Sequence, residues 1–296
     1  MQSEDCEKVQ RFFLYANPGK PETIPTVKNF AELLISRNCE VQLDHWLYNI
    51  ANIGKACTIE QLDSTFKAVI CFGGDGTLLR ILPQSATHQV PVLGVNMGHT
   101  GFLLEVGPND LSGIIDRLMK DNYTIQERSM LSCQINGRCS NLVMNEFALT
   151  RGKNPSSLVV DVLYNDELVY TIHGDGVLVS TPTGTTGYSL SAGGPILYPD
   201  LSCHVVVPIC SHIMHQRPVV LPQDGEIRLE VRANRGMMHQ ISMDGQIVLD
   251  LDTNTKITIN HSHVASRFIR FASQRFFSRL HHKQREWSDH VYGGIS

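Results

Sequence analysis

The periodicity of the hydrophobic residues changes near residue 125, and this change constrains the fold more than any other feature. Before it, short apolar runs that fit buried strands, among them residues 12–16, 68–72 and 90–95, alternate with segments of helical spacing. One helical face is predicted to carry Val27, Phe30, Leu33 and Leu34, and another Leu111, Ile114, Ile115 and Leu118. Strands that alternate with helices predict an α/β domain, in which helices pack on a parallel sheet.

After residue 125 short β-rich runs dominate, and little of the chain has helical spacing. The runs cover residues 131–135, 142–149, 158–164, 168–172, 177–180, 205–209, 227–231, 241–243, 247–251 and 257–259. The dipeptides Asn136-Gly137, Asn165-Asp166, Asp224-Gly225 and Asp244-Gly245 are typical of tight turns between strands. We therefore expect a second domain of mostly antiparallel β-structure, with a sandwich of sheets as one arrangement of it.

These patterns also predict the domain boundaries. Residues 1–123 should form the α/β domain and residues 124–266 the β-rich domain. The tail comprises residues 267–296. Its residues 267–287 are predicted to form a helix, and the tail is expected to dock on a neighbouring domain. Two domains fit a chain of 296 residues, at roughly 100–200 residues for each domain.

Composition argues against several classes of protein. A net charge of −4 disfavours a broad nucleic-acid-binding surface, although it leaves room for a local basic patch. The first ten residues do not resemble a signal peptide, and no apolar run approaches the ~20 residues that span a bilayer. The eight cysteines form no Cys-x-x-Cys pair, which favours reduced thiols in the cytoplasm over a disulfide scaffold.

One loop combines three glycines with a single acid, in the run Gly73-Gly74-Asp75-Gly76-Thr77. Glycines let backbone N–H groups approach a ligand, and a loop between a strand and a helix aims them at an anion such as phosphate. The spacing matches neither a Walker A loop nor the Rossmann fingerprint. A carboxylate repels phosphate unless it binds a metal ion or accepts a proton from an attacking hydroxyl, and both roles belong to phosphoryl transfer. The alternative for Asp75 is an N-cap of the helix that follows.

Two further segments are rich in polar groups. Residues 174–195, GDGVLVSTPTGTTGYSLSAGGP, hold six glycines and seven Ser or Thr residues. They offer backbone donors and hydroxyls to a polyhydroxylated, phosphate-bearing ligand, with Tyr188 as a face for a base, or else they form a long surface loop. Asn145 and Glu146 stand in an expected strand, where one of two neighbours should face a core or cleft and the other the opposite side.

In this order, GGDGT, the Asn145-Glu146 pair and GDGVLVSTPTGTTGYSLSAGGPI resemble the NAD kinase family over nearly the whole chain. The PICSHIMHQRPVVLP run and the SMDGQ turn fit the same pattern, whereas diacylglycerol kinases, sphingosine kinases and phosphofructokinases share only a GGDGT-like loop. The resemblance implies ATP-dependent phosphorylation of the 2′-hydroxyl of the adenosine ribose of NAD, which gives NADP. It also implies a homodimer or homotetramer, a catalytic α/β domain, and NAD bound between that domain and the β-rich one.

The resemblance further assigns roles to single residues. Asp75 resembles the proton acceptor or metal-linked acid, Asn145 and Glu146 the pair that holds ribose hydroxyls, and Asp175 an acid near the nicotinamide. The other ligand-binding positions that it implies are Gly74, Gly76, Thr77, Arg80, His173, Thr186, Gly187, Tyr188, Ser189, Leu190, Ser191 and Gln246. Arg80 could instead be a solvated residue on a helix face, and Gln246 could simply follow a type I′ turn.

The sequence departs from the family pattern at two positions. Gly187 replaces a common alanine, which would loosen one wall of the adenine pocket, and His173 replaces a common arginine, which leaves the preference for NAD or NADH open. Because the glycine-rich loop holds no obvious cation of the chain, Mg²⁺ or another divalent cation is expected on charge grounds, without a protein metal site assigned to it. ATP and polyphosphate both stay open as the donor.

Two other functions compete with an NAD kinase. A lipid kinase of the diacylglycerol or sphingosine type would share GGDGT but should also show a membrane-docking surface, for which the sequence gives no sign. A catalytically silent NADP-binding regulator is disfavoured by the presence of Asp75. A structural zinc site is the weakest alternative, since the cluster of Cys203, His204, Cys210, His212 and His215 matches no familiar zinc spacing.

Overall fold

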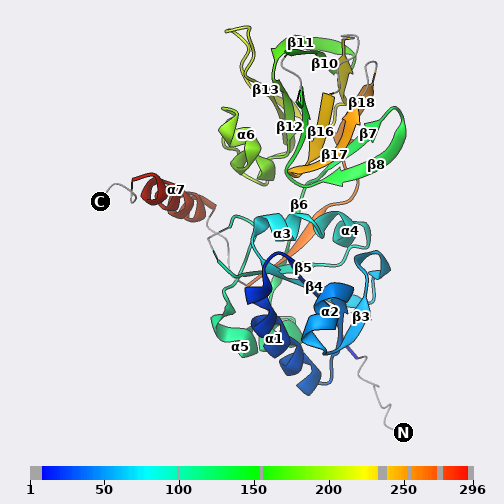
Figure 1. Ribbon diagram of the computed structural model, residues 1–296, viewed down its shortest axis with the longest axis vertical. Helices are drawn as coiled ribbons and strands as arrows, with labels where there is room; N and C mark the ends of the chain where they lie inside the picture. Colours follow the sequence, from blue (N-terminus) through cyan, green and yellow to red (C-terminus); the bar gives the residue numbers. More distant parts are fainter. Residues whose placement is uncertain are drawn as a thin grey trace. The chain divides into compact units, whose positions relative to one another are not determined.

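The computed structural model describes residues 9–98, 101–153, 156–232, 239–251, 255–271 and 276–292. The chain divides into two compact units, one made of the residues up to 127 together with those from 267 onward, and the other of residues 128–266 (Figure 1). The first unit is α/β with a parallel sheet and the second is antiparallel and β-rich, so the predicted fold class is confirmed.

The α/β unit is built on one seven-stranded sheet. From one edge to the other its strands are β3 (Lys55–Cys57), β2 (Glu40–Asp44), β1 (Arg11–Ala16), β4 (Phe66–Gly73), β5 (Val92–Asn96), β19 (Ser266–Arg270) and β6 (Thr124–Arg128). All neighbours from β3 to β19 run parallel. The helices of this unit are α1 (Ile24–Ser36), α2 (His45–Ala51), α3 (Asp75–Leu79), α4 (Leu82–Thr87), α5 (Leu111–Met119) and α7 (Phe276–Tyr292).

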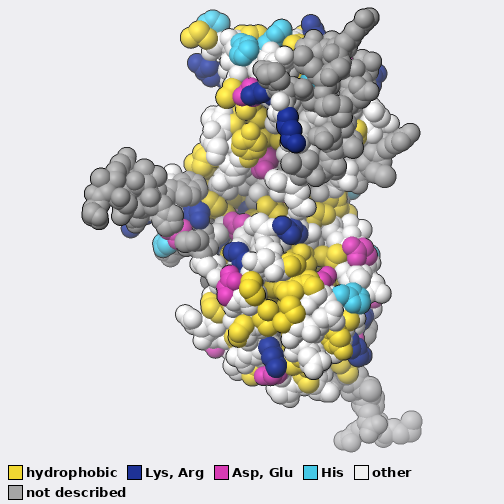
Figure 2. Space-filling model, viewed as in Figure 1, with side chains coloured by type: hydrophobic (Ala, Val, Ile, Leu, Met, Phe, Trp, Pro, Cys, Tyr) yellow, Lys and Arg dark blue, Asp and Glu magenta, His cyan; other side chains and the backbone are white. Residues whose placement is uncertain are grey.

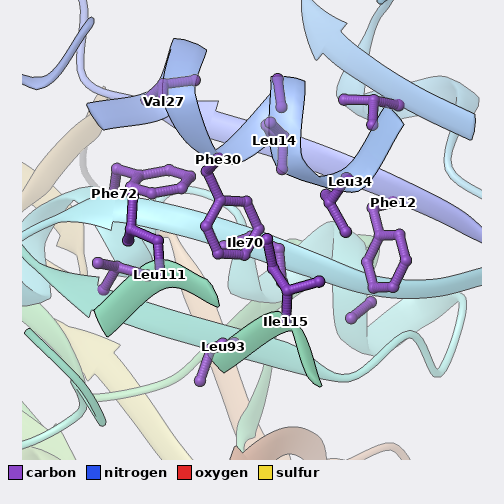
Figure 3. Close-up of a cluster of buried hydrophobic side chains, with 14 of the residues drawn as sticks. Phe12, Leu14, Val27, Phe30, Leu34, Ile70, Phe72, Leu93, Leu111 and Ile115 are labelled. Atoms are coloured by element: carbon purple, nitrogen blue, oxygen red, sulfur yellow. The ribbon is translucent and has the colours of Figure 1, made fainter. Parts of the chain in front are cut away.

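Helices α1 and α5 cover one face of this sheet with a shared apolar core. The close-up in Figure 3 shows side chains of both helices directed at the strands: Val27, Phe30 and Leu34 from α1, Leu111 and Ile115 from α5, and Phe12, Leu14, Ile70, Phe72 and Leu93 from the sheet. Phe30 and Phe72 meet edge to face with their ring centroids 5.4 Å apart. This packing fixes the carboxyl ends of β1, β4 and β5 in one row, which is where open α/β sheets bind ligands.

The tail of the chain differs from its prediction. A helix was expected over residues 267–287, but Ser266–Arg270 form strand β19, and α7 begins only at Phe276. Phe268 and Ile269 are adjacent and both fully buried, which is typical of a strand covered on both faces. The prediction is therefore wrong for the first part of the tail, because the helical spacing of its phenylalanines was outweighed by burial in the sheet.

The second unit contains two six-stranded sheets, and all strand pairings described within them are antiparallel. The first has the order β11 (Glu167–Gly174), β10 (Leu158–Tyr164), β15 (Ile227–Val231), β18 (Lys256–His261), β7 (Leu131–Ile135) and β8 (Arg138–Val143). The second has the order β14 (Val219–Pro222), β13 (Cys203–Ile209), β12 (Gly176–Ser180), β9 (Glu146–Thr150), β16 (His239–Met243) and β17 (Gln246–Leu251), and the short helix α6 (Tyr188–Ser191) follows β12. One apolar cluster joins side chains of both sheets, so the unit is a β-sandwich.

Two local predictions in this unit are wrong. The run 142–149 is not one strand, because β8 ends at Val143 and β9, in the other sheet, begins at Glu146. Asp224-Gly225 does not close a hairpin, because it lies between β14 and β15, which belong to different sheets. The other three dipeptides do close hairpins and have positive φ at both residues, for example 49° and 74° at Asp244 and Gly245, as type I′ turns require.

One face of the described surface carries charges of both signs and a group of hydrophobic side chains. On the face drawn in Figure 2, basic and acidic side chains are interspersed, and hydrophobic side chains gather over helices α1 and α2 of the α/β unit. Ile35 of α1 and Ile50 of α2 are 43% and 58% exposed. Of the helices that the structure describes, none is long and apolar enough to cross a membrane.

Candidate functional site

The glycine-rich loop lines a cavity of about 190 Å³ within the α/β unit. The cavity lies where β1, β4 and β5 end, and it is lined by Lys20, Gly73, Gly74, Asp75, Asn96, Gly98, Gly101 and Lys283. A Cβ atom built on Gly74, Gly76 or Gly98 would meet nothing within 4 Å, so the backbone at these positions borders open space. A ligand can therefore approach the N–H groups here as closely as an anion requires.

Asp75 is the acid of this cavity, and its carboxylate is held by backbone donors. Its Oδ2 accepts the N–H of Phe102 at 2.8 Å and its Oδ1 accepts the N–H of Leu103 at 3.1 Å. Gly74 is the N-cap of α3, and Asp75 is the first helical residue, so the N-cap alternative for Asp75 is wrong. Burial raises the pKa of Asp75, while the two N–H groups and the nearby charges of Lys283 and Arg279 oppose that rise.

Residues 102–105, which include the two N–H donors to Asp75, are themselves held by charged side chains that bind their carbonyl groups. Arg270 donates to the carbonyl of Leu103 at 2.9 Å and to the carboxylate of Glu105 at 3.2 Å, and both of these charged side chains are almost completely buried. Arg279 of α7 donates to the carbonyl of Phe102 at 3.3 Å and to that of Leu104. The N–H groups of this segment thus point to Asp75 while its carbonyls point to the two arginines, which keeps the carboxylate in one position.

The other predicted residues of this loop have different surroundings. Thr77 is buried, and a Cβ atom on Gly73 would lie 2.5 Å from its hydroxyl oxygen, so Thr77 packs beneath the loop. Arg80 is exposed and hydrogen bonds the hydroxyl of Tyr15. The phosphate contact predicted for Arg80 stays a prediction, because Arg80 is not among the residues that line the cavity.

The expectation that the chain supplies no cation at this loop is wrong. Lys20 and Lys283 both line the cavity. Lys20 follows β1 in the Asn17-Pro18-Gly19 turn, so the sequence did hold a signal for it, a lysine just beyond the end of a predicted strand. Lys283 comes from α7, more than 200 residues away in the sequence from Asp75, and no local pattern connects the two.

In the β-sandwich a second polar cluster forms around Asp244. The Asp244 carboxylate accepts three consecutive backbone N–H groups, from Met144 at 2.9 Å, Asn145 at 2.6 Å and Glu146 at 3.3 Å. The three N–H groups belong to the residues at which the chain leaves β8 and enters β9, so they bond to Asp244 there. Sequence reasoning identified Asp244 only as a turn residue, yet its carboxylate determines where the predicted run 142–149 is interrupted.

This interruption brings the side chains of Asn145 and Glu146 together. A Cβ atom built on Gly187 would lie 3.2 Å from Glu146 Oε2 and 3.6 Å from Asn145 Nδ2, so both side chains reach the same point. The prediction that the two side chains face opposite sides is therefore wrong, because it assumed a continuous strand. The absence of a methyl group at Gly187 leaves room beside both polar ends.

Glu146 and Asp244 form a coupled pair of buried acids. Burial raises the pKa of Glu146 to about 8, with a further rise from the neighbouring Asp244, and the N–H of Tyr188 opposes it. Burial also raises the pKa of Asp244 to about 6, against the three N–H groups that it accepts. Near neutral pH the coupled pair therefore holds one proton. Within the described residues Glu146 Oε2 has no hydrogen-bond partner, so it is available to a hydroxyl of a ligand.

Raising the pH should destabilise this cluster. The folded protein binds the proton of Glu146 more tightly than the unfolded chain, so the stability from protonation is fully present below about pH 4.5 and is lost as the pH rises through about 8. We expect Glu146→Gln to be more stable than the native protein above pH 8, by on the order of 2 kcal/mol, and nearly equal to it below pH 5. Thermal unfolding across this range measures the difference. Glu167→Gln, at an exposed glutamate of the same unit, is the control, and a parallel pH dependence in all three proteins would contradict the assignment.

Most of the remaining predicted residues belong to the segment 175–191 of the β-sandwich, and their exposure differs. Tyr188 is 43% exposed, and burial followed by the charges of Cys210, Asp175 and Glu146 raises its pKa. Asp175 pairs with Arg151 at 2.6 Å. Thr186 donates to the carbonyl of Thr183 at 3.1 Å, Ser189 is buried, Leu190 is half-buried, and Ser191 is exposed.

The last two predicted residues are exposed side chains at strand ends. His173 contributes its backbone carbonyl to the N–H of His212 at 2.7 Å, and Gln246 follows the Asp244-Gly245 turn. No described contact links the side chains of these two residues to the cluster around Asp244. As for metals, the described residues contain no group of three or more His, Cys, Asp or Glu side chains that could hold an ion.

Comparison with known proteins gives consistent matches. A family model described as the ATP-NAD kinase N-terminal domain matches residues 12–123, and one described as the ATP-NAD kinase C-terminal domain matches residues 144–271. The NAD kinase of Heliobacterium modesticaldum is 34% identical over 276 residues, which is 91% of this chain and 96% of that protein. The NAD kinase of Christiangramia forsetii is 32% identical over 265 residues, 85% of this chain and 90% of that protein.

Solved structures resemble the chain along most of its length. The NAD kinase from Archaeoglobus fulgidus in complex with ATP superposes with a TM-score of 0.72 at 26% identity, covering 93% of this chain and 99% of that one. Yeast NADH kinase complexed with NADH superposes with a TM-score of 0.84 at 22% identity, covering 92% of this chain and 86% of that one. At that identity the yeast structure shows a shared fold alone.

Proposed function

Since the chain belongs to the NAD kinase family, we propose that it transfers the γ-phosphate of ATP to the 2′-hydroxyl of the adenosine ribose of NAD, giving NADP. The observation that carries the proposal is the position of Asp75, a half-buried carboxylate at a cavity bordered by bare glycine backbone. Such a cavity suits phosphate, and an acid beside phosphate suits proton transfer from an attacking hydroxyl.

The chemistry assigned to Asp75 is that of a general base. A secondary hydroxyl is a weak nucleophile near neutral pH, and a carboxylate within reach can accept its proton as the bond to phosphorus forms. Burial raises the pKa of Asp75, which makes it a stronger proton acceptor than a solvated aspartate. Its two N–H bonds fix its orientation while leaving lone pairs on both oxygens, so the base is positioned before the substrate binds.

The polar groups of the β-sandwich are proposed to hold the dinucleotide. Glu146 Oε2 and Asn145 Nδ2 lie close to one point, and a protonated carboxyl beside an amide offers both donors and acceptors to a ribose diol. Tyr188 offers an exposed aromatic face to the adenine, with residues 186–191 around it. We propose that Asp175, His173 and Gln246 contact other parts of the dinucleotide, as the resemblance implies.

A divalent cation such as Mg²⁺ is proposed to enter with ATP. Mg²⁺ is usually bound through one or two carboxylates plus the phosphates of the substrate. Among the described residues that line the cavity, Asp75 is the only acid, so the residues fit an ion whose ligands come mainly from phosphate. When bound, the ion would neutralise charge on the phosphate groups.

The broader setting of the enzyme is also a proposal. We propose residues 1–123 as the catalytic nucleotide domain, residues 124–266 as the NAD-binding domain, and residues 267–296 as a tail that packs against a neighbouring domain; the two compact units support this division. We further propose a homodimer or homotetramer in the cytoplasm, with no nucleic-acid or membrane partner. The net charge of −4 supports the absence of nucleic acid from this list.

An NADP-forming assay tests the function directly. The protein is incubated with ATP, Mg²⁺ and NAD, and NADP is measured with an NADP-specific dehydrogenase. We expect NADP that accumulates in proportion to the protein and that requires both ATP and NAD. Parallel reactions in which NADH replaces NAD identify the preferred acceptor, and reactions in which polyphosphate replaces ATP identify the phosphoryl donor. Absence of NADP, together with phosphorylation of diacylglycerol or sphingosine, would replace this function by a lipid kinase.

A further inference from the structure

Two lysines distant in the sequence meet at the cavity beside Asp75. Lys20 follows β1, and Lys283 lies in α7 near the end of the described chain. With two ammonium groups and one carboxylate, the residues that line the cavity carry a net positive charge. The volume of about 190 Å³ is below the ~300–1,000 Å³ typical of pockets for whole small molecules, so it suits part of a ligand, such as a chain of phosphates.

The backbone around Lys20 is well anchored, while its side chain forms no ion pair with any acid among the described residues. The N–H of Lys20 donates to the carbonyl of Asn17 at 2.9 Å, and its own carbonyl accepts the N–H and hydroxyl of Thr23 at 3.1 and 2.8 Å. No ion pair of Lys20 occurs within the residues that the structure describes. Among the described residues, Lys20 therefore stands at the cavity without a salt bridge of its own.

Lys283 reaches the cavity because α7 is attached to the segment that holds Asp75. Arg279 of α7 donates to the carbonyls of Phe102 and Leu104 and lies 3.4 Å from the carboxylate of Glu105. Lys283 follows Arg279 by four residues, so both side chains lie on the same side of the helix. The partner described for Lys283 is Glu286 of the same helix, at 3.3 Å, and the two side chains of this half-buried pair are 21% and 25% exposed.

We propose that Lys20 and Lys283 bind the phosphate chain of the phosphoryl donor, which makes helix α7 part of the donor site. This inference rests on the proposed kinase function and adds to it two residues outside the glycine-rich loop. Lysine binds phosphate as a point charge, so either a nucleoside triphosphate or inorganic polyphosphate satisfies the chemistry. The lysines would also offset the repulsion between Asp75 and the phosphates, which the loop alone does not do.

Direct binding to the full chain tests this proposal without relying on catalysis. Calorimetry measures the affinity for MgATP and, separately, for tripolyphosphate, in the absence of NAD. We expect Lys283→Met and Lys20→Met each to weaken MgATP binding by about tenfold, as loss of a charge-assisted contact predicts. Lys28→Met, at an exposed lysine of α1, is the matched control and should bind as the native protein does. Tripolyphosphate binding that weakens in the same variants identifies the phosphate chain as the recognised part, whereas binding of MgATP alone identifies a nucleotide donor.

Two more variants distinguish the charge of Lys283 from the position of helix α7. Lys283→Arg should restore most of the affinity, because it restores the charge. Arg279→Met keeps Lys283 but removes the contacts of α7 to residues 102–105, and it should weaken binding about as much as Lys283→Met. Affinity of Lys283→Met and Lys20→Met within twofold of the native protein, with unchanged unfolding midpoints, would overturn the inference. A native protein that binds MgATP through these lysines but forms no NADP would instead overturn the proposed function and leave this site standing.

Discussion

Asp75→Asn is expected to reduce the rate of NADP formation by roughly 10²–10⁴-fold, the usual contribution of a general base. Asparagine has nearly the same shape but cannot accept a proton from the ribose hydroxyl. The effect should fall on kcat, because the carboxylate is assigned to the proton transfer and not to the binding of ATP. Steady-state kinetics with ATP and NAD varied separately measure it.

The hydrogen bonds of Asp75 require a control for this variant. The carboxylate accepts the N–H groups of both Phe102 and Leu103, whereas an asparagine offers one oxygen and turns its NH₂ group toward the other donor. One N–H would lose its partner, at about 1–3 kcal/mol. MgATP affinity distinguishes the two effects: it should be equal or higher in the variant, since a negative charge has left the cavity, whereas a collapsed loop would lower it.

A second aspartate provides a matched comparison for Asp75→Asn. Asp44 is the last residue of β2 in the same sheet, and its side chain accepts the N–H of Trp46 at 3.3 Å as the N-cap of α2. Asparagine is as good an N-cap as aspartate, so Asp44→Asn should keep both activity and stability. Native rates in Asp75→Asn would show that the proton leaves by another route and that Asp75 serves only to hold residues 102 and 103.

The fold was predictable from the sequence because burial leaves a periodic pattern. The alternation before residue 125 identified β1, β4 and the apolar faces of α1 and α5, and the short runs after it identified most strands of the sandwich. Periodicity failed where contacts between distant segments decided the structure. Strand β19 is one case, because its place between β5 and β6 is not visible in the local spacing of residues 267–271.

The candidate site was predictable where the reactive side chain and the glycines that shape the loop stand in one short segment of sequence. Gly73 to Thr77 could be recognised because glycines, an acid and a strand end stand together. The groups that complete the site could not, because they come from elsewhere in the chain. Arg279 contacts a carbonyl 177 residues away, and Asp244 accepts N–H groups from residues 98 to 100 positions earlier. Sequence patterns report local preference, and these contacts form only once the fold exists.

Asp244→Ala is expected to disrupt the polar cluster of the β-sandwich, because one carboxylate satisfies three backbone donors there. Alanine would leave the N–H groups of Met144, Asn145 and Glu146 without their acceptor, and the combined cost should be about 3–9 kcal/mol, at about 1–3 kcal/mol for each donor. Thermal unfolding measures this loss, and NADP formation should fall by roughly a hundredfold or more as Asn145 and Glu146 move.

The hairpin between β10 and β11 offers a control that separates the carboxylate of Asp244 from its backbone strain. Asp166 also occupies a type I′ turn, with φ of 66° against 49° at Asp244, so alanine incurs a similar strain at both positions. The Asp166 side chain, however, is 80% exposed and pairs only at the surface with Arg228. Asp166→Ala should therefore lose about 1 kcal/mol or less and keep full activity. Equal losses of stability in the two variants would mean that turn strain, and not the three N–H bonds, explains the effect. A loss confined to Asp244→Ala would show that the Asp244 carboxylate, about 100 residues away in the sequence, holds Asn145 and Glu146 in position.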